Sequence, residues 1–150
     1  MDIRSSQAGS DDRRWLLVAD GDEDGANVLA GLLLHHRFRA YPTGRGAEAL
    51  RVAVIHPLGL AVVDLSLRDM PGPDLVRRLR QIDSKLPVVV TSADLSADAE
   101  RRARELGILR YVHKPYDPRR IAVLAAKLFA LPPVAGPRLV SLGLSVERQA

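Results

Sequence analysis

The chain of 150 residues has no cysteine, few aromatic residues and few lysines. Without cysteine, disulfide bonds, zinc–thiolate sites and thiol catalysis are excluded. Aromatic residues make up 4% of the chain, and lysine occurs only at 85, 114 and 127, so nearly all basic residues are arginine. No apolar run approaches the roughly 18 residues of a membrane span. The N-terminal stretch MDIRSSQAGSDDRR lacks the apolar core of a signal peptide. We therefore expect a cytoplasmic protein that does not enter a membrane.

The composition predicts a folded domain with a mixed surface. Hydrophobic residues make up 47% of the chain and charged residues 27%, and 22 basic against 18 acidic residues give a net charge of +4. Arginines cluster at 77–80, 101–104 and 119–120. A nucleic-acid site would need one basic face with interleaved aromatic residues. We expect solvated helix faces and no direct nucleic-acid binding, with a partner-binding surface as the alternative.

Apolar runs of strand length alternate with segments of helical periodicity. The pattern predicts strands at 15–19, 37–41, 58–65, 87–92 and 108–113, and helices at 23–36, 47–55, 74–82, 96–107 and 118–130. Near-continuous apolar strands indicate a parallel sheet that is covered on both faces. With right-handed crossovers this is an α/β, flavodoxin-like, doubly wound fold. We expect a five-stranded parallel sheet in the order 2-1-3-4-5 with five helices.

Polar residues end four of the predicted strands. Asp20 follows the first strand, Asp64 ends the third, Thr91 and Ser92 end the fourth, and Lys114 follows the fifth. In a doubly wound sheet the carboxyl ends of the strands form one cleft at the topological switch point. The sequence therefore predicts two acids, a hydroxyl group and an ammonium group in one site.

The stretch VADGDEDG, with Asp20, Asp22 and Asp24 on alternate positions, is compatible with three kinds of site. An EF-hand loop starting at Asp20 would need its bidentate glutamate at the twelfth position, which is Gly31. A phosphatase of the haloacid dehalogenase type usually has Thr or Val where Asp24 stands. A receiver domain holds magnesium with acids at the end of its first strand, and the rest of the chain favours this third interpretation.

The segments LLVADGDED, LAVVDLSLRDMPGPDL, PVVVTSAD and YVHKP decide between these sites. Together they resemble a response-regulator receiver domain over roughly residues 14–130. The resemblance implies that Asp64 accepts a phosphoryl group from a histidine kinase or a phosphotransfer protein, and that the domain is a signalling switch rather than an enzyme. A carboxylate is a competent phosphoryl acceptor, which supports this role on chemical grounds.

The resemblance also implies the roles of the residues around Asp64. Magnesium would be bound by Asp20, Asp64 and the backbone carbonyl of Ser66. Thr91 and Lys114 would contact the phosphoryl oxygens, and Thr91 would act with Tyr111 in the switch, the tyrosine changing its rotamer on activation. Magnesium, an ammonium group and a hydroxyl donor are the groups that neutralise a transferred phosphoryl group.

The chain departs from the receiver pattern at Gly21, because receivers usually carry two adjacent acids after the first strand. Three accounts stay open. Asp22 caps the following helix, or Gly21 relaxes the loop so that Asp22 reaches the metal, or the chain is a degenerate receiver that switches poorly.

A second departure lies after Asp64. Arg68 stands where the related pattern D-L-x-L-P-D-M-x-G has proline, and we expect the neighbouring Asp69 to be a loop or capping residue rather than a ligand.

We expect three parts: a flexible tail at 1–13, a receiver domain at 14–131, and a Pro/Gly linker with a short tail at 132–150 and no effector domain. Within the tail, VSLGLSVE (140–147) alternates apolar with mainly polar residues. It is expected either to be loose or to add to a strand edge of a partner or a second copy, giving a homodimer. The chain would then be a stand-alone receiver that signals to a downstream protein, or alternatively a pseudo-receiver that binds partners without phosphorylation.

Overall fold

The computed structural model describes residues 15–130, so the expected tails at 1–13 and 132–150 lie outside the described residues. The strands are β1 (Trp15–Ala19), β2 (Arg39–Thr43), β3 (Leu58–Asp64), β4 (Val88–Ser92) and β5 (Arg110–His113). The helices are α2 (Glu23–His35), α3 (Gly46–Ile55), α4 (Gly72–Ile82), α5 (Ala97–Arg104) and α6 (Arg119–Ala130). All ten elements predicted between residues 15 and 130 are present.

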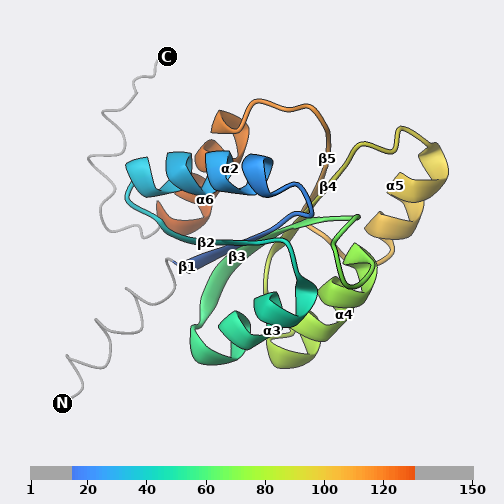
Figure 1. Ribbon diagram of the computed structural model, residues 1–150, viewed down its shortest axis with the longest axis horizontal. Coiled ribbons are helices and arrows are strands. Elements are labelled where there is room, and N and C mark those ends of the chain that lie inside the picture. The colour runs from blue at the N-terminus through green and yellow to red at the C-terminus, as the bar shows by residue number, and fades with distance from the viewer. Residues whose placement is uncertain (1–14, 131–150) are drawn as a thin grey trace.

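The five strands form one parallel sheet in the order β2-β1-β3-β4-β5, which confirms the predicted topology. Helices α2 and α6 cover one face, and α3 and α4 cover the other (Figure 1). Successive side chains of a strand point to opposite faces, so Leu17 packs under α3 and α4 whereas Leu16 packs under α2 and α6. All seven residues of the central strand β3 are buried, because helices cover both of its faces.

Strand β2 differs in position from its prediction. The predicted strand begins at 37, but Arg37 has φ of 71° and lies in the turn after α2, where its N–H donates to the Leu34 carbonyl. The strand instead runs through Pro42, which pairs with Val18 of β1. Proline has no N–H to donate, and it is tolerated here because β2 is an edge strand with one side unpaired.

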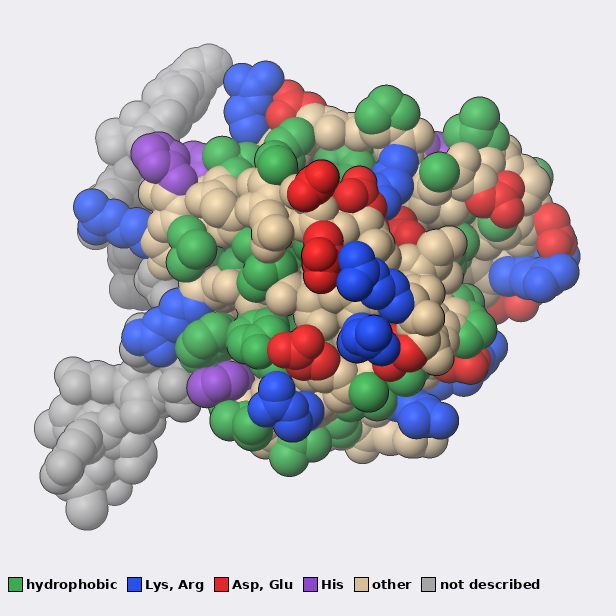
Figure 2. All heavy atoms as spheres, viewed as in Figure 1, with side chains coloured by type: hydrophobic (Ala, Val, Ile, Leu, Met, Phe, Trp, Pro, Cys, Tyr) green, Lys and Arg blue, Asp and Glu red, His purple; other side chains and the backbone are tan. Residues whose placement is uncertain are grey.

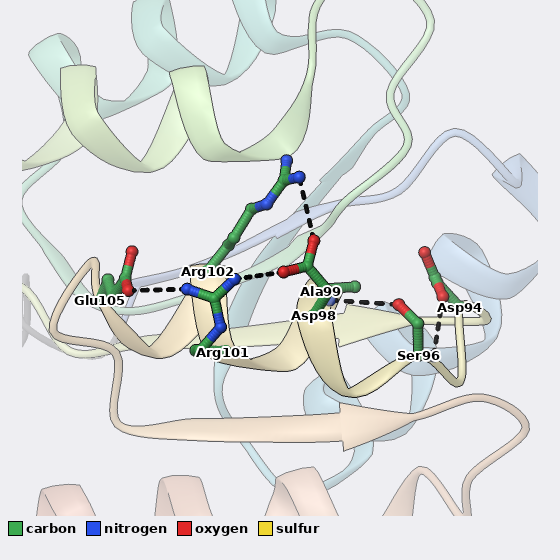
Figure 3. A network of polar contacts seen from close by, with 7 residues as sticks. All are labelled: Asp94, Ser96, Asp98, Ala99, Arg101, Arg102 and Glu105. Atoms are coloured by element: carbon green, nitrogen blue, oxygen red, sulfur yellow. Dashed lines mark hydrogen bonds and ion pairs between the residues drawn. The ribbon is translucent and has the colours of Figure 1, made fainter.

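Helix α5 is shorter than predicted, because it ends at Arg104 rather than at 107. It is stabilised mainly by contacts between exposed groups. Ala103 is its one buried residue. Its first turn is capped by Ser96, whose Oγ accepts from the Ala99 N–H at 3.1 Å. Along its exposed side, ion pairs join Asp98 to Arg101 and Arg102, and Arg101 to Glu105 (Figure 3). Each exposed pair of this kind contributes about 0.3–0.5 kcal/mol, so α5 has little burial to anchor it.

The arginine clusters lie on helix surfaces, where many arginines pair with acids of the same segment. Arg77 contacts Asp74 at 2.9 Å, and Arg119 contacts Asp117 at 2.7 Å. On the face seen in Figure 2, basic and acidic side chains are intermixed rather than gathered by sign. This arrangement agrees with the expected solvated helix faces. Within residues 15–130, no helix combines the length and apolar character needed to cross a bilayer.

Arg80 near the end of α4 ties two loops to that helix. Its Nε donates to the Leu86 carbonyl at 3.1 Å, and its two terminal nitrogens donate to the carbonyls of Leu106 (3.3 Å) and Gly107 (2.8 Å). Gly107 has φ of 75°, a conformation that favours glycine. One guanidinium thus links α4 to the segment that leads into β4 and to the turn between α5 and β5.

We predict that Arg80→Ala lowers the free energy of unfolding by about 2 kcal/mol, because three carbonyls lose a charged donor. Arg80→Lys should lose most of this stabilisation, since an ammonium cannot reproduce the planar fork. Arg77→Ala is the control on the same helix and should change stability by less than about 0.5 kcal/mol, because its ion pair is exposed. Urea denaturation measures all three, and equal losses for Arg80→Ala and Arg77→Ala would contradict the structural role.

Candidate functional site

The carboxyl ends of the strands bring the four predicted polar residues together. Asp20 follows β1, Asp64 is the last residue of β3, Thr91 lies near the end of β4, and Lys114 follows β5. Asp64 and Thr91 are direct partners in the β3–β4 register. The predicted clustering at one edge of the sheet is confirmed, and the four residues come from segments almost one hundred positions apart in the chain.

The Lys114 ammonium lies between the two buried acids. Its Nζ is 2.8 Å from Asp20 Oδ2 and 3.1 Å from Asp64 Oδ1. Burial disfavours the charged amine, but its hydrogen bonds to Asp20 and Asp64 outweigh this effect and raise the pKa of Lys114 above its ordinary value. Lys114 is therefore a fixed positive charge that both carboxylates share.

Asp20 bears an electrostatic cost despite this partner. Its side chain is only 9% exposed. Burial raises the pKa of Asp20, and the nearby Asp64 raises it further, against the lowering effect of hydrogen bonds from Lys114 and the Asp22 N–H. The desolvation effect wins because one ammonium is divided between two carboxylates. The site therefore favours any additional positive charge.

Asp64 is held by donors that leave its carboxylate facing the cleft. Thr91 donates from Oγ1 to Asp64 Oδ1 at 3.1 Å, and the Ser66 N–H donates to Oδ2 at 2.9 Å. A cleft of about 510 Å³ lies over these groups, lined by Asp20, Asp22, Asp64, Ser66, Arg68, Asp94 and Lys114 among others. A small anionic group can therefore reach Asp64 from the solvent.

Gly21 allows the loop after β1 to approach the loop after β3. Its N–H donates to the Ser66 carbonyl at 3.1 Å, and a Cβ at position 21 would lie only 2.8 Å from that oxygen. Any side chain here would force the two loops apart. The glycine that breaks the receiver pattern therefore has a structural role, because it brings Ser66 against the end of β1.

Asp22 has different surroundings from the two buried acids, Asp20 and Asp64. Asp22 occupies the N-cap position of α2 but makes no side-chain capping bond, and it lines the cleft. Within residues 15–130, no group of three or more acids, histidines or cysteines is arranged so that it could hold a metal ion, and a metal contact of Asp22 stays a prediction.

Asp69 caps α3, as predicted. Its oxygens accept from the N–H groups of Gly46 (2.6 Å) and Ala47 (3.0 Å), and these bonds lower its pKa. The loop after β3 is thereby fastened to the start of α3, on the side of the sheet that carries α4.

Two tyrosines flank the site, and only one was predicted. Tyr111 is buried, with its hydroxyl 3.5 Å from the Asp94 carbonyl in the loop after β4. Tyr116, which sequence reasoning did not single out, lines a second cleft of about 580 Å³ between α2 and the loop after β5. Burial and the charge of Asp20 raise the pKa of Tyr116. Its place two residues after Lys114 was the available signal, because that loop must border the cleft.

Comparison with known proteins agrees with this geometry. The family profile of the response regulator receiver domain matches residues 16–126. Transcriptional regulatory protein PrrA of Mycobacterium tuberculosis is 34% identical over 119 residues, covering 77% of this chain and 48% of that protein. Sporulation initiation phosphotransferase F of Bacillus subtilis is 24% identical over 103 residues, covering 68% of this chain and 82% of that protein.

A solved structure shows the same fold. The non-phosphorylated HemR receiver domain from Leptospira biflexa aligns with a TM-score of 0.70 at 24% identity, covering 79% of this chain and 96% of that one. The chain belongs to the response regulator receiver domain family, whose members are phosphorylation-based signalling domains of two-component systems. It spans less than half the length of several curated regulators that it matches, including 44% of CtrA from Caulobacter vibrioides.

We predict opposite effects for two glycine substitutions. Gly21→Ala should lower the free energy of unfolding by about 1–3 kcal/mol, because its Cβ would overlap the Ser66 carbonyl. Gly31→Ala, in the middle of α2 with no atom within 4 Å of the added Cβ, should raise it by about 0.5–1 kcal/mol. Chemical denaturation of both proteins tests the contact, and a Gly21→Ala protein as stable as wild type would show that the two loops can separate freely.

We also predict that Asp20→Asn stabilises the metal-free protein at neutral pH, by about 1 kcal/mol. The pKa of folded Asp20 lies above its ordinary value of 3.8, so stability falls as the pH rises from 3.8 to that raised pKa and stays lowered at higher pH. The gain from asparagine should therefore be present at pH 7 and vanish in acid. Thermal melts across pH in the presence of a chelator measure it, and a loss of stability at pH 7 would mean that the Lys114 contact outweighs burial.

Proposed function

We propose that this domain is a phosphorylation-controlled switch that accepts a phosphoryl group on Asp64 and signals through protein–protein contacts. The observation that carries the proposal is the setting of Asp64. Its carboxylate faces an open cleft, with the Lys114 Nζ and the Thr91 Oγ1 each 3.1 Å from Oδ1. An acceptor oxygen is thus accompanied by an ammonium group and a hydroxyl donor, the groups that a bound phosphoryl group needs.

The chemistry proposed for the chain is a direct transfer. An Asp64 oxygen forms the new P–O bond, while the bond from phosphorus to the histidine nitrogen of the donor breaks and its electrons leave with the imidazole. Lys114 and Thr91 would contact the phosphoryl oxygens, since little acid–base help is needed and charge neutralisation is the main requirement. Thr91 and Tyr111 would then change position in response to the new charge, and Tyr111 would change its contact with the Asp94 carbonyl.

The residues present fit a magnesium ion, which neutralises phosphoryl charge when bound. Asp20, Asp64 and the Ser66 carbonyl are oxygen donors on one side of the cleft, and magnesium is usually held by one or two carboxylates with waters and phosphate oxygens. The raised pKa of Asp20 supports this assignment, because burial leaves its negative charge undercompensated. With Gly21 in place of an acid, the site offers two direct carboxylates.

The proposed donor is a sensor histidine kinase or a phosphotransfer protein. The match to a sporulation initiation phosphotransferase supports a place in a phosphorelay. The proposed output is a downstream protein, and the proposed location is cytoplasmic.

One observation favours a second candidate, a pseudo-receiver that binds partners without phosphorylation. Gly21 stands where receivers usually have a second acid. Its N–H already donates a hydrogen bond to the Ser66 carbonyl at 3.1 Å. The intact set of Asp64, Thr91 and Lys114 favours the switch.

We predict that acetyl phosphate with magnesium adds one phosphoryl mass to the wild type and none to Asp64→Asn, as measured by intact mass spectrometry. Asp69→Asn is the control, because Asp69 caps α3 and should leave labelling unchanged. Labelling of Asp64→Asn would remove the proposed acceptor. A folded wild-type protein that no phosphodonor labels would establish the pseudo-receiver.

A further inference from the structure

Arg68 is the feature of the cleft that the proposed function leaves unused. It stands where the receiver pattern has proline, and its side chain lines the cleft over Asp64. Its backbone N–H donates to the Gly44 carbonyl at 3.0 Å. Its side chain crosses Gly44 so closely that a Cβ there would lie 3.2 Å from Nε. A side chain at position 44 would require the Arg68 side chain to shift by a few tenths of an ångström.

The Arg68 guanidinium is only loosely held. Among the described residues, its one polar partner is Glu23 in the first turn of α2, with NH1 3.4 Å from Oε2. The side chains are 44% and 61% exposed, so the pair contributes at most about 1 kcal/mol. A more strongly charged anion in the cleft can therefore take the guanidinium from Glu23 at little cost.

The charge of the cleft shows why a second cation matters. Lys114 is the other cationic side chain on its wall, and it is already divided between Asp20 and Asp64. A phosphodonor that enters must approach these acids and also Asp22 and Asp94. A guanidinium can bind phosphate oxygens through two parallel N–H donors, whereas its contact with Glu23 is a single exposed pair at 3.4 Å.

We propose that Arg68 is a phosphate-binding residue of this chain, which leaves Glu23 and pairs with the phosphoryl oxygens of the incoming donor. This inference rests on the proposed role of Asp64 as acceptor. With acetyl phosphate, an Asp64 oxygen forms a P–O bond, the P–O bond to acetate breaks, and acetate leaves with the bonding electrons. No proton or redox co-reactant is required, and Arg68 contributes charge and orientation only.

The test is the rate of acetyl phosphate labelling, followed by intact mass at fixed excess magnesium and low ionic strength. Arg68→Gln should label roughly fivefold to tenfold more slowly than wild type, and Arg68→Lys should recover part of the loss. Arg51→Gln is the matched control, because Arg51 is also an exposed arginine in a loose pair with a helix glutamate, 3.8 Å from Glu48. This substitution removes one positive charge at a position that does not line the cleft. Its labelling rate should stay within about twofold of the wild-type rate.

Glu23→Gln provides the opposite change. It frees the guanidinium and should raise the labelling rate about twofold in the wild-type background, but not in the Arg68→Gln background. Equal acceleration in both backgrounds would mean that Glu23 acts by its charge alone, and would overturn the inference. Equal rates for Arg68→Gln and Arg51→Gln would overturn it as well.

The two proposals fail in different ways. A wild-type protein that is not labelled refutes the acceptor role and with it the inference, whereas normal labelling with no effect of Arg68 refutes the inference alone. Should Arg68→Gln not fold, Arg68→Ala replaces it as the second background, and an unchanged rate for Glu23→Gln in the wild-type background would overturn the role of Arg68.

Discussion

The charge balance around Lys114 is the constraint on which the functional end of the domain depends. One ammonium lies within 2.8 Å of Asp20 and 3.1 Å of Asp64, and the pKa of Asp20 remains raised because burial outweighs this shared partner. Two buried acids with one cation form a site that is incomplete without further positive charge. Arg68 adds a second cationic side chain to the lining of the cleft, at a position where the family pattern has an uncharged proline.

Close contacts between backbones hold this charge cluster in place. Gly21 lets the loop after β1 reach the Ser66 carbonyl, and Gly44 lets Arg68 cross toward Glu23. The Gly21 contact depends on the absence of a Cβ, which would lie 2.8 Å from the Ser66 carbonyl oxygen. Separating the loops would break the backbone hydrogen bonds from Gly21 to Ser66 and from Arg68 to Gly44. The sheet positions Asp20 and Asp64, and Gly21 and Gly44 allow the loops around these acids to pack closely against one another.

Much of the fold was predictable because it depends on local patterns. Apolar runs and helical periodicity located every element from 15 to 130, and strand ends located Asp64 and Lys114. The predicted start of β2 at residue 37 was wrong, because hydrophobic periodicity does not reveal the left-handed turn at Arg37. The contacts of Gly21 with Ser66 and of Arg68 with Glu23 could not be predicted, since each joins segments that are far apart in the chain and meet only in the folded sheet.

Helix α5 has a further consequence for how the domain meets its surroundings. With Ala103 as its one buried residue, the helix is stabilised by the Ser96 cap and by exposed ion pairs (Figure 3). Dissolved ions screen such pairs, with a Debye length of about 8 Å at physiological ionic strength, whereas they leave apolar burial nearly unchanged. The ionic strength of the surrounding solution therefore affects the stability of α5 more strongly than that of the helices packed over β3.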